Sequence, residues 1–166
     1  MVQPGLSRGP GASVEIKDLS LKEWLAVCER AEGACVRRFR EIAGQSDPGD
    51  TSLRRFLQNL VSEEEGHVEA IRRFGEGVRG PDVWRLDDIL LDHVLKRHFP
   101  SFGQGFGEGN LSRDVALYLA ECVERESSRF YRDLSEGASD PAARDFFRKV
   151  AEGEESHLKC IQTTLL

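Results

Sequence analysis

The chain has 166 residues, of which 39% are hydrophobic and 31% are charged, and these values suit a single soluble domain with a hydrophobic core. Its formal charge of −6 argues against nucleic acid or an anionic membrane as the main partner, because both would repel it. No apolar run reaches the length of a membrane span, and the four cysteines form no C-x-x-C pair, which favours small buried residues in a reducing cytoplasm.

The chain opens with a segment that we expect to be a flexible tail. Residues 1–17 begin MVQPGLSRGPGAS, which contains an arginine but no apolar central region, so the segment lacks the pattern of a secretory signal. A single domain is then predicted over residues 18–166. We expect this domain to be cytoplasmic, because its cysteines are typical of a reducing compartment.

A capping signal and the helical spacing of apolar residues predict a first pair of long helices. The first helix begins at Ser20, where Glu23 completes a capping box, and extends to about Ala43. The turn GQSDPGD separates it from a second helix over about 51–74. Apolar residues recur on one face of this second helix, at Leu57, Leu60, Val61, Val68 and Ile71.

A second pair of helices follows a long connection. The third helix is predicted over about 112–136, and the fourth begins after Asp140 as N-cap, with Pro141 at its first position. The connection, about 75–111, is rich in glycine and contains WRLDDILLDHVLKRHF, which predicts one short amphipathic helix. Short turns make each pair an antiparallel hairpin, and the connection carries the chain back along them. The sequence therefore predicts an all-α fold, a ferritin-like four-helix bundle with one long crossover.

Two acidic segments of the chain, residues 32–71 and 124–161, repeat one another. A single E-x-x-H pattern on a helix is usually a solvated face, but here two such patterns and two upstream glutamates fall in register. Four carboxylates and two imidazoles are the ligands of a dinuclear metal site inside a helical bundle. The corresponding residues are Glu32 and Glu124, Glu64 and Glu154, and His67 and His157.

Helix geometry predicts that these side chains meet. At about 1.5 Å per residue, Glu32 and Glu64 lie roughly 17 and 20 Å from the first hairpin turn. By the same rule, Glu124 and Glu154 lie roughly 18 and 21 Å from the second turn. Four ionised carboxylates at one level of a bundle would repel one another and lose hydration, whereas two divalent cations balance their charge. We therefore expect a metal site at this level.

The other acidic residues and histidines are weaker candidates for metal ligands. Glu29 and Glu121 also correspond across the repeat, but they lie one turn earlier, where they either line an ion path or face water. His93 and His98 lie on the crossover without an acidic partner at motif spacing, so surface or packing roles are expected. Solvated carboxylates are expected at Glu63, Glu65, Glu69, Glu152 and Glu155.

With these motifs, the chain resembles the rubrerythrin-type branch of the ferritin-like di-iron superfamily over roughly residues 20–165. The resemblance rests on E-x-x-H in the second and fourth helices and on E-x6-[FY] in the first and third. The aromatic residues of the latter motif are Phe39 and Tyr131. We expect both to serve packing, although the Tyr131 hydroxyl can also reach a ligand carboxylate.

The resemblance implies two metal ions, expected to be iron, with manganese or zinc as alternatives. Glu64 and Glu154 would bridge the two ions, while Glu32 and Glu124 would be terminal ligands. His67 and His157 would each bind one ion. The repeat itself selects these six residues, and the resemblance adds the role of each one.

The chain departs from the family pattern at several points. It lacks the paired C-x-x-C motifs of a rubredoxin domain, so the implied electron donor is another protein. Rubrerythrins carry an additional glutamate one turn after the third-helix ligand, where this chain has Ser127, and the repeat counterpart is Cys35. The remaining six ligands are closer to those of bacterioferritin. No haem is expected, because Met1 is the only methionine, and no fifth helix is predicted that would favour a mineral-storing cage.

The leading functional prediction is a di-iron redox protein that reduces peroxide or dioxygen while oxidising Fe(II), an oxidoreductase of the peroxidase or ferroxidase type. Oxygen and nitrogen ligands suit iron or manganese, and a pair of metals can hold both oxygens of a peroxide. A ferritin-type ferroxidase that handles iron and a non-redox bundle for zinc or regulation are the alternatives. The expected partners are iron, peroxide or dioxygen, an external electron donor protein and a second copy of the chain in a homodimer.

Overall fold

A computed structural model describes residues 19–79, 88–106 and 110–165. Within these ranges the chain forms five α-helices and one short 3-10 helix, η2, without a β-strand. The elements are α1 (Leu21–Gln45), α2 (Thr51–Glu76), α3 (Asp88–His98), η2 (Pro100–Gly103), α4 (Arg113–Gly137) and α5 (Pro141–Leu165). In the described part of the chain, no helix has the length and apolar character needed to cross a membrane. The predicted tail, residues 1–17, lies outside the described residues.

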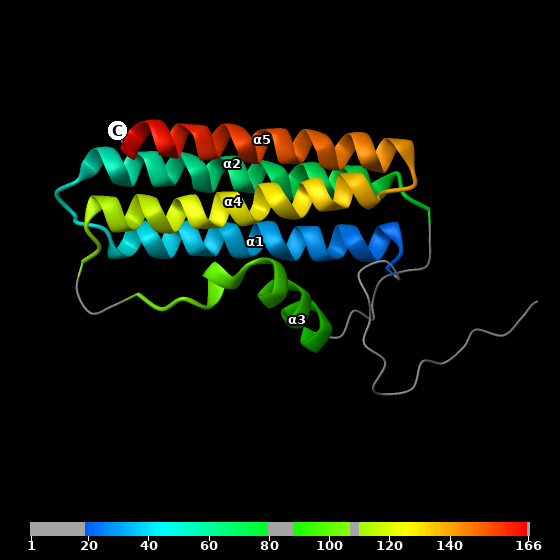
Figure 1. Cartoon of the computed structure of the whole chain (residues 1–166), viewed down its shortest axis with the longest axis horizontal. Coiled ribbons are helices and arrows are strands. Elements are labelled where there is room, and N and C mark those ends of the chain that lie inside the picture. Colours follow the sequence, from blue (N-terminus) through cyan, green and yellow to red (C-terminus); the bar gives the residue numbers. More distant parts are fainter. Residues whose placement is uncertain (1–18, 80–87, 107–109, 166) are drawn as a thin grey trace, which may run out of the picture.

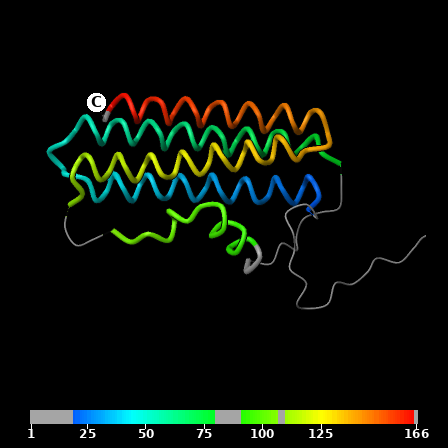
Figure 2. The backbone as a smooth tube through the Cα atoms, viewed as in Figure 1, coloured from blue at the N-terminus to red at the C-terminus, as the bar shows by residue number. Residues whose placement is uncertain are grey.

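The four long helices lie side by side and form the predicted bundle. Figure 1 shows α1, α2, α4 and α5 with their axes aligned, while α3 and η2 lie outside the bundle next to α1. The backbone trace in Figure 2 shows that α1 and α2 are joined at one end of the bundle and α4 and α5 at the opposite end. The ferritin-like fold expected from the sequence is therefore confirmed.

Side-chain caps explain where the helices begin. At the start of α1, the Ser20 hydroxyl accepts a hydrogen bond from the Glu23 amide at 3.3 Å, and the Glu23 carboxylate accepts one from the Ser20 amide at 2.7 Å. The Asp50 carboxylate caps α2 by accepting a hydrogen bond from the Leu53 amide at 2.9 Å. Asp140 caps α5 in the same way, through the Ala143 amide at 2.8 Å. These caps satisfy amides that have no partner inside their own helix.

Polar contacts fix the crossover against the bundle. The Glu126 carboxylate on α4 accepts hydrogen bonds from the backbone amide and hydroxyl of Ser101, the latter at 2.6 Å. On α1, the Arg38 guanidinium donates to the Gln104 carbonyl at 2.6 Å and lies 4.1 Å from the centre of the Phe106 ring. The predicted short helix is observed as α3, and the start of its segment at Trp84 lies outside the described residues.

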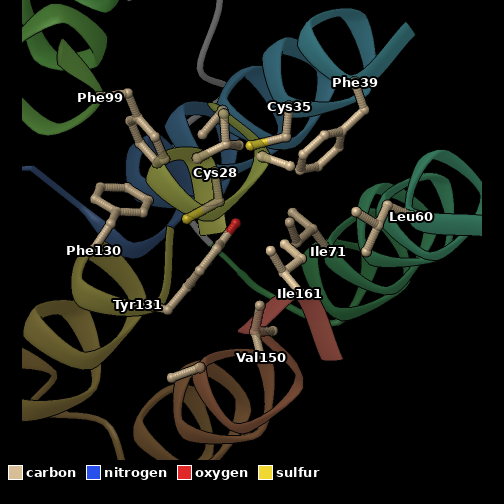
Figure 3. Packing of buried hydrophobic residues seen from close by; sticks show 14 of the residues in the cluster. Cys28, Cys35, Phe39, Leu60, Ile71, Phe99, Phe130, Tyr131, Val150 and Ile161 are labelled. Atoms are coloured by element: carbon tan, nitrogen blue, oxygen red, sulfur yellow. The ribbon is translucent and has the colours of Figure 1, made fainter. Parts of the chain in front are cut away.

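The long helices pack around a hydrophobic core, part of which Figure 3 shows from close by. Of the apolar residues expected on α2, Leu57, Leu60 and Ile71 are buried, while Val61 and Val68 are half-buried. The expectation for the cysteines is only partly correct. Cys28 and Cys35 are buried on α1 and Cys122 is half-buried, but Cys160 is exposed, because it lies on the outward face of α5.

Candidate metal centre

Each of the four long helices contributes one buried carboxylate to the interior of the bundle. Glu32 on α1, Glu64 on α2, Glu124 on α4 and Glu154 on α5 are at most 1% exposed. The antiparallel hairpins place all four at the same level, as the distances from the turns predicted. Buried carboxylates are rare in proteins unless a partner compensates their charge. The structure therefore brings together the predicted glutamates at a place where compensation is needed.

His67 on α2 lies against three of these carboxylates. Its Nδ1 atom is 3.1 Å from Oε1 of Glu154, 3.5 Å from Oε2 of Glu64 and 3.8 Å from Oε2 of Glu32. Because His67 follows Glu64 by three residues on one helix, the two side chains point the same way. The α1 and α5 carboxylates reach this group from neighbouring helices.

His157 on α5 has a matching environment. Its Nδ1 atom is 3.2 Å from Oε1 of Glu64, 3.5 Å from Oε1 of Glu124 and 3.6 Å from Oε2 of Glu154. The His67 and His157 rings are stacked, with centroids 5.5 Å apart. The two imidazole rings are thus close neighbours, and each faces the carboxylates of the cluster through its Nδ1 atom.

Two overlapping groups of possible ligand atoms result from this arrangement. Within each group the atoms lie within 4.8 Å of one another, which suits a single metal ion. Glu64 and Glu154 belong to both groups, and each directs one oxygen toward His67 and the other toward His157. The groups are Glu32, Glu64, His67 and Glu154, and Glu64, Glu124, Glu154 and His157. A pair of shared carboxylates between two ions is the geometry of a dinuclear site.

Within the described residues, the candidate ligand atoms of the cluster form His–Glu ion pairs at 3.1–3.8 Å but no hydrogen bond. All eight carboxylate oxygens and both Nδ1 atoms are buried, and among the described residues none of them makes a hydrogen bond. Leaving a buried polar atom unpaired costs about 1–3 kcal/mol, and more when the group is charged. Two divalent cations would satisfy these atoms and balance the carboxylates, so the residues present fit a dinuclear metal site. Oxygen and imidazole donors suit iron, manganese or zinc.

Burial and mutual repulsion divide the carboxylates into two kinds. Burial raises the pKa of Glu32 and of Glu124 well above the usual range, and the charges of Glu64 and Glu154 raise it further. Burial also acts to raise the pKa of Glu64 and Glu154, but their contacts with both histidines outweigh it and lower the pKa. In the metal-free protein, protonation is therefore favoured at Glu32 and Glu124, and ionisation is favoured at Glu64 and Glu154.

The histidines carry the opposite charge. Burial alone would lower the pKa of each ring, but the surrounding carboxylates outweigh it. They raise the pKa of His67 far above its ordinary value and that of His157 to about 12. Two protonated histidines then balance two ionised glutamates, so protons take the place of metal charge in the metal-free cluster.

Two residues lie beside the histidine rings in positions that the sequence did not suggest. Glu63 was expected to be a solvated carboxylate, and its side chain is 54% exposed, yet its Oε2 atom lies 3.0 Å from Nε2 of His157. Gly153 lies beside the other ring, where an added Cβ would be 3.2 Å from Nε2 of His67. Spacing within one helix contains no signal for these contacts, because each joins α2 to α5.

The remaining acidic and histidine candidates lie outside the cluster. Glu29 pairs with Arg72 at 2.7 Å, and Glu121 pairs with Arg125 at 2.6 Å. His93 is exposed, whereas the His98 ring packs 5.3 Å from Phe130, so both have the surface or packing roles expected of them. The expected solvent exposure holds for Glu65, Glu69 and Glu152, while Glu155 is half-buried and pairs with Arg132.

Ser127 and Cys35 occupy the positions where an additional carboxylate is missing from the repeat, and both are buried. Ser127 and Cys35 are each 1% exposed, and among the described residues the Ser127 hydroxyl has no hydrogen-bond partner. Burial raises the pKa of Cys35, and negative charge on the neighbouring carboxylates, including those of Glu64 and Glu154, raises it further. Cys35 is therefore a neutral thiol beside the carboxylates.

The two aromatic residues of the helix motifs pack in the core. Phe39 and Tyr131 are fully buried, and Figure 3 shows the Tyr131 side chain crossing from α4 toward Cys28 on α1. Among the described residues the Tyr131 hydroxyl makes no hydrogen bond. Burial raises the pKa of Tyr131, and the neighbouring Glu32 carboxyl raises it further. Packing is thus the role that the geometry supports.

Removal of the Tyr131 hydroxyl is expected to leave the metal-free protein as stable as before or to stabilise it. An unpaired buried hydroxyl costs about 1–3 kcal/mol, so Tyr131→Phe should raise the free energy of unfolding by up to about 3 kcal/mol. Urea denaturation of both proteins in a chelator measures the difference. A loss of about 1 kcal/mol or more would instead indicate a hydrogen bond from this hydroxyl.

Comparison with known proteins gives one match. A protein-family model described as Rubrerythrin matches residues 23–165, which extend from the first turns of α1 to the end of α5. All six residues of the cluster lie within the matched range. Searches of curated proteins and of solved structures found no match.

Proposed function

The chain belongs to the rubrerythrin family, and on this basis we propose that it is a di-iron redox protein that reduces peroxide or dioxygen while oxidising Fe(II). The family implies a dinuclear metal site, usually of iron. The observation that carries the proposal is the pair of overlapping candidate ligand groups, whose buried carboxylate oxygens and Nδ1 atoms make no hydrogen bond within the described part of the chain.

The side chains have distinct proposed roles in holding the ions. Glu64 and Glu154 would be the ligands common to both ions, because each has one oxygen directed to each histidine. Glu32 with His67, and Glu124 with His157, complete the two groups. A bound Fe(II) pair would supply the two electrons that reduce a peroxide.

The surroundings of the cluster suit this chemistry. The carboxylates are buried, which excludes bulk water and strengthens their electrostatic interactions. Each peroxide reduced to water consumes two electrons and two protons, so repeated turnover requires an outside source of electrons. We propose an external electron donor protein for this step and a homodimer as the assembly.

An iron-handling ferroxidase is the second candidate, and the residue at position 127 favours it. Ser127 is buried in place of an additional carboxylate, which leaves the six-ligand set of the cluster. Storage of oxidised iron requires a hollow oligomer, whereas a peroxidase does not. Light scattering separates the two, because a dimer would count against the storage function.

The proposed reaction predicts a defined result with iron. Anaerobic addition of Fe(II) to the metal-free chain is expected to load about two ions per chain, the number that the two ligand groups can hold. Peroxide is then expected to change the iron absorption spectrum within seconds, and comparison with dioxygen identifies the preferred oxidant. Two bound irons that respond to neither oxidant would contradict a redox function and favour a zinc or regulatory role.

A further inference from the structure

The two halves of the cluster differ at the outer nitrogen of each histidine ring. The Nε2 atom of His157 lies 3.0 Å from the Glu63 carboxylate, whereas Nε2 of His67 lies beside the backbone of Gly153. Glu63 and Gly153 are counterparts in the repeat, because each directly precedes a central glutamate of the cluster. One histidine therefore has an outer carboxylate at a position where the other has no side chain at all.

From this difference we infer that Glu63 is a positioning residue for His157 and that the metal position served by His157 binds its ion more tightly than the position served by His67. The inference rests on the proposed dinuclear centre. A carboxylate at the outer nitrogen of a histidine fixes the ring and its tautomer and makes the inner nitrogen a stronger ligand. Glu63 can do this for Nδ1 of His157, which faces the carboxylate cluster.

His67 lacks this support. No ion pair is found at its Nε2 atom among the described residues, and its side chain is 19% exposed compared with 11% for His157. A Cβ at position 153 would lie 3.2 Å from this nitrogen, closer than ordinary contact. Gly153 thus leaves the ring room to move and offers no acceptor to hold it.

The expected consequence is stepwise metal binding. Loss of an outer partner of a ligand histidine typically reduces metal affinity about 10–100-fold. The first ion should therefore occupy the group that contains Glu124 and His157, and the second should occupy the group that contains Glu32 and His67 with an affinity lower by a similar factor. Glu64 and Glu154 belong to both groups and do not distinguish them.

A Co(II) titration of the metal-free full chain tests the inference, with binding followed by visible absorption and by calorimetry. The wild-type chain is expected to bind two ions in separate steps. In Glu63→Gln the first step should weaken about 10–100-fold while the second stays unchanged, so that the steps merge. In Gly153→Ala the added methyl group should displace His67 and weaken the second step alone.

Glu69→Gln is the matched control, because Glu69 is also an exposed carboxylate of α2 but pairs with Arg73. It should bind as the wild type does. Two ions bound with equal affinity by the wild type, or a Glu63→Gln variant that keeps both steps or loses both equally, would overturn the inference while leaving the dinuclear centre intact. A wild-type chain that binds fewer than two ions would overturn the proposed centre itself.

Discussion

Replacement of Glu64 with alanine is expected to abolish the binding of two metal ions by the chain. Oε2 of Glu64 lies 3.5 Å from Nδ1 of His67, and its Oε1 lies 3.2 Å from Nδ1 of His157, so one substitution removes a ligand from both groups. Glu154→Ala should have the same effect, because Glu154 also faces both histidines. Metal analysis after anaerobic loading, together with the peroxide-dependent change in the iron spectrum, measures the outcome.

The choice of variant matters because Glu64 is also part of the metal-free charge balance. Removing one partner of a buried ion pair destabilises a protein by about 3–5 kcal/mol, so the alanine variant can lose stability as well as metal. Glu64→Gln keeps the size of the side chain and serves as the second variant. It should retain the helical circular dichroism spectrum and still fail to hold two ions.

Glu65→Ala is the control for both substitutions. Glu65 is the next residue of α2, but it is exposed and pairs with Arg40 at the surface, where an ion pair contributes at most about 1 kcal/mol. This variant should bind two ions and respond to peroxide as the wild type does. Normal iron loading in Glu64→Ala and Glu154→Ala would contradict the assignment of these residues as bridging ligands.

Much of the fold could be predicted because its signals are local. The capping box of Ser20 and Glu23 and the Asp140 cap depend only on residues within one turn, and each is observed. The ends of helices are less well determined. α1 continues to Gln45 instead of Ala43, because the extended backbone that ends the helix occurs only at Ser46, whose amide still bonds to the Ile42 carbonyl.

The six residues of the cluster could be selected because the repeat separates them from a crowded acidic background. Glu63 and Glu64 are adjacent in the chain, and only Glu64 has a glutamate at the equivalent position of the second half. The same comparison led to the expectation that Glu63 is merely solvated. Its contact with His157 depends on how α2 and α5 are rotated toward each other, and this rotation is a property of the packed bundle.

Metal binding to this cluster is expected to release about four protons for two ions at neutral pH. The raised pKa values of His67 and His157 keep both rings protonated in the metal-free chain, and the raised pKa values of Glu32 and Glu124 favour neutral carboxyls. An imidazole or carboxyl must lose its proton before it can bind an ion, so two ions displace the protons of these four groups.

The sign of the pH dependence follows from this exchange. Protons compete with metal, so the affinity should rise with pH, by roughly a hundredfold per pH unit for each ion if each displaces two protons. Two contributions set the pH dependence of the metal-free protein. The raised pKa values of Glu32 and His157 contribute stability that is lost as the pH rises through the values of the folded state, whereas the lowered pKa values of Glu64 and Glu154 contribute stability that is lost as the pH falls.

Calorimetric titration with Co(II) in buffers of different ionisation enthalpy measures the number of protons released. Glu124→Gln provides an internal test, because its amide resembles the protonated carboxyl but has no proton to release. At Co(II) concentrations that load both positions, this variant should release about one proton fewer. Glu69→Gln should release as many protons as the wild type, since Glu69 is exposed and pairs with Arg73. Release of only about two protons would mean that Glu32 and Glu124 are already ionised, so that the metal-free cluster carries a net negative charge.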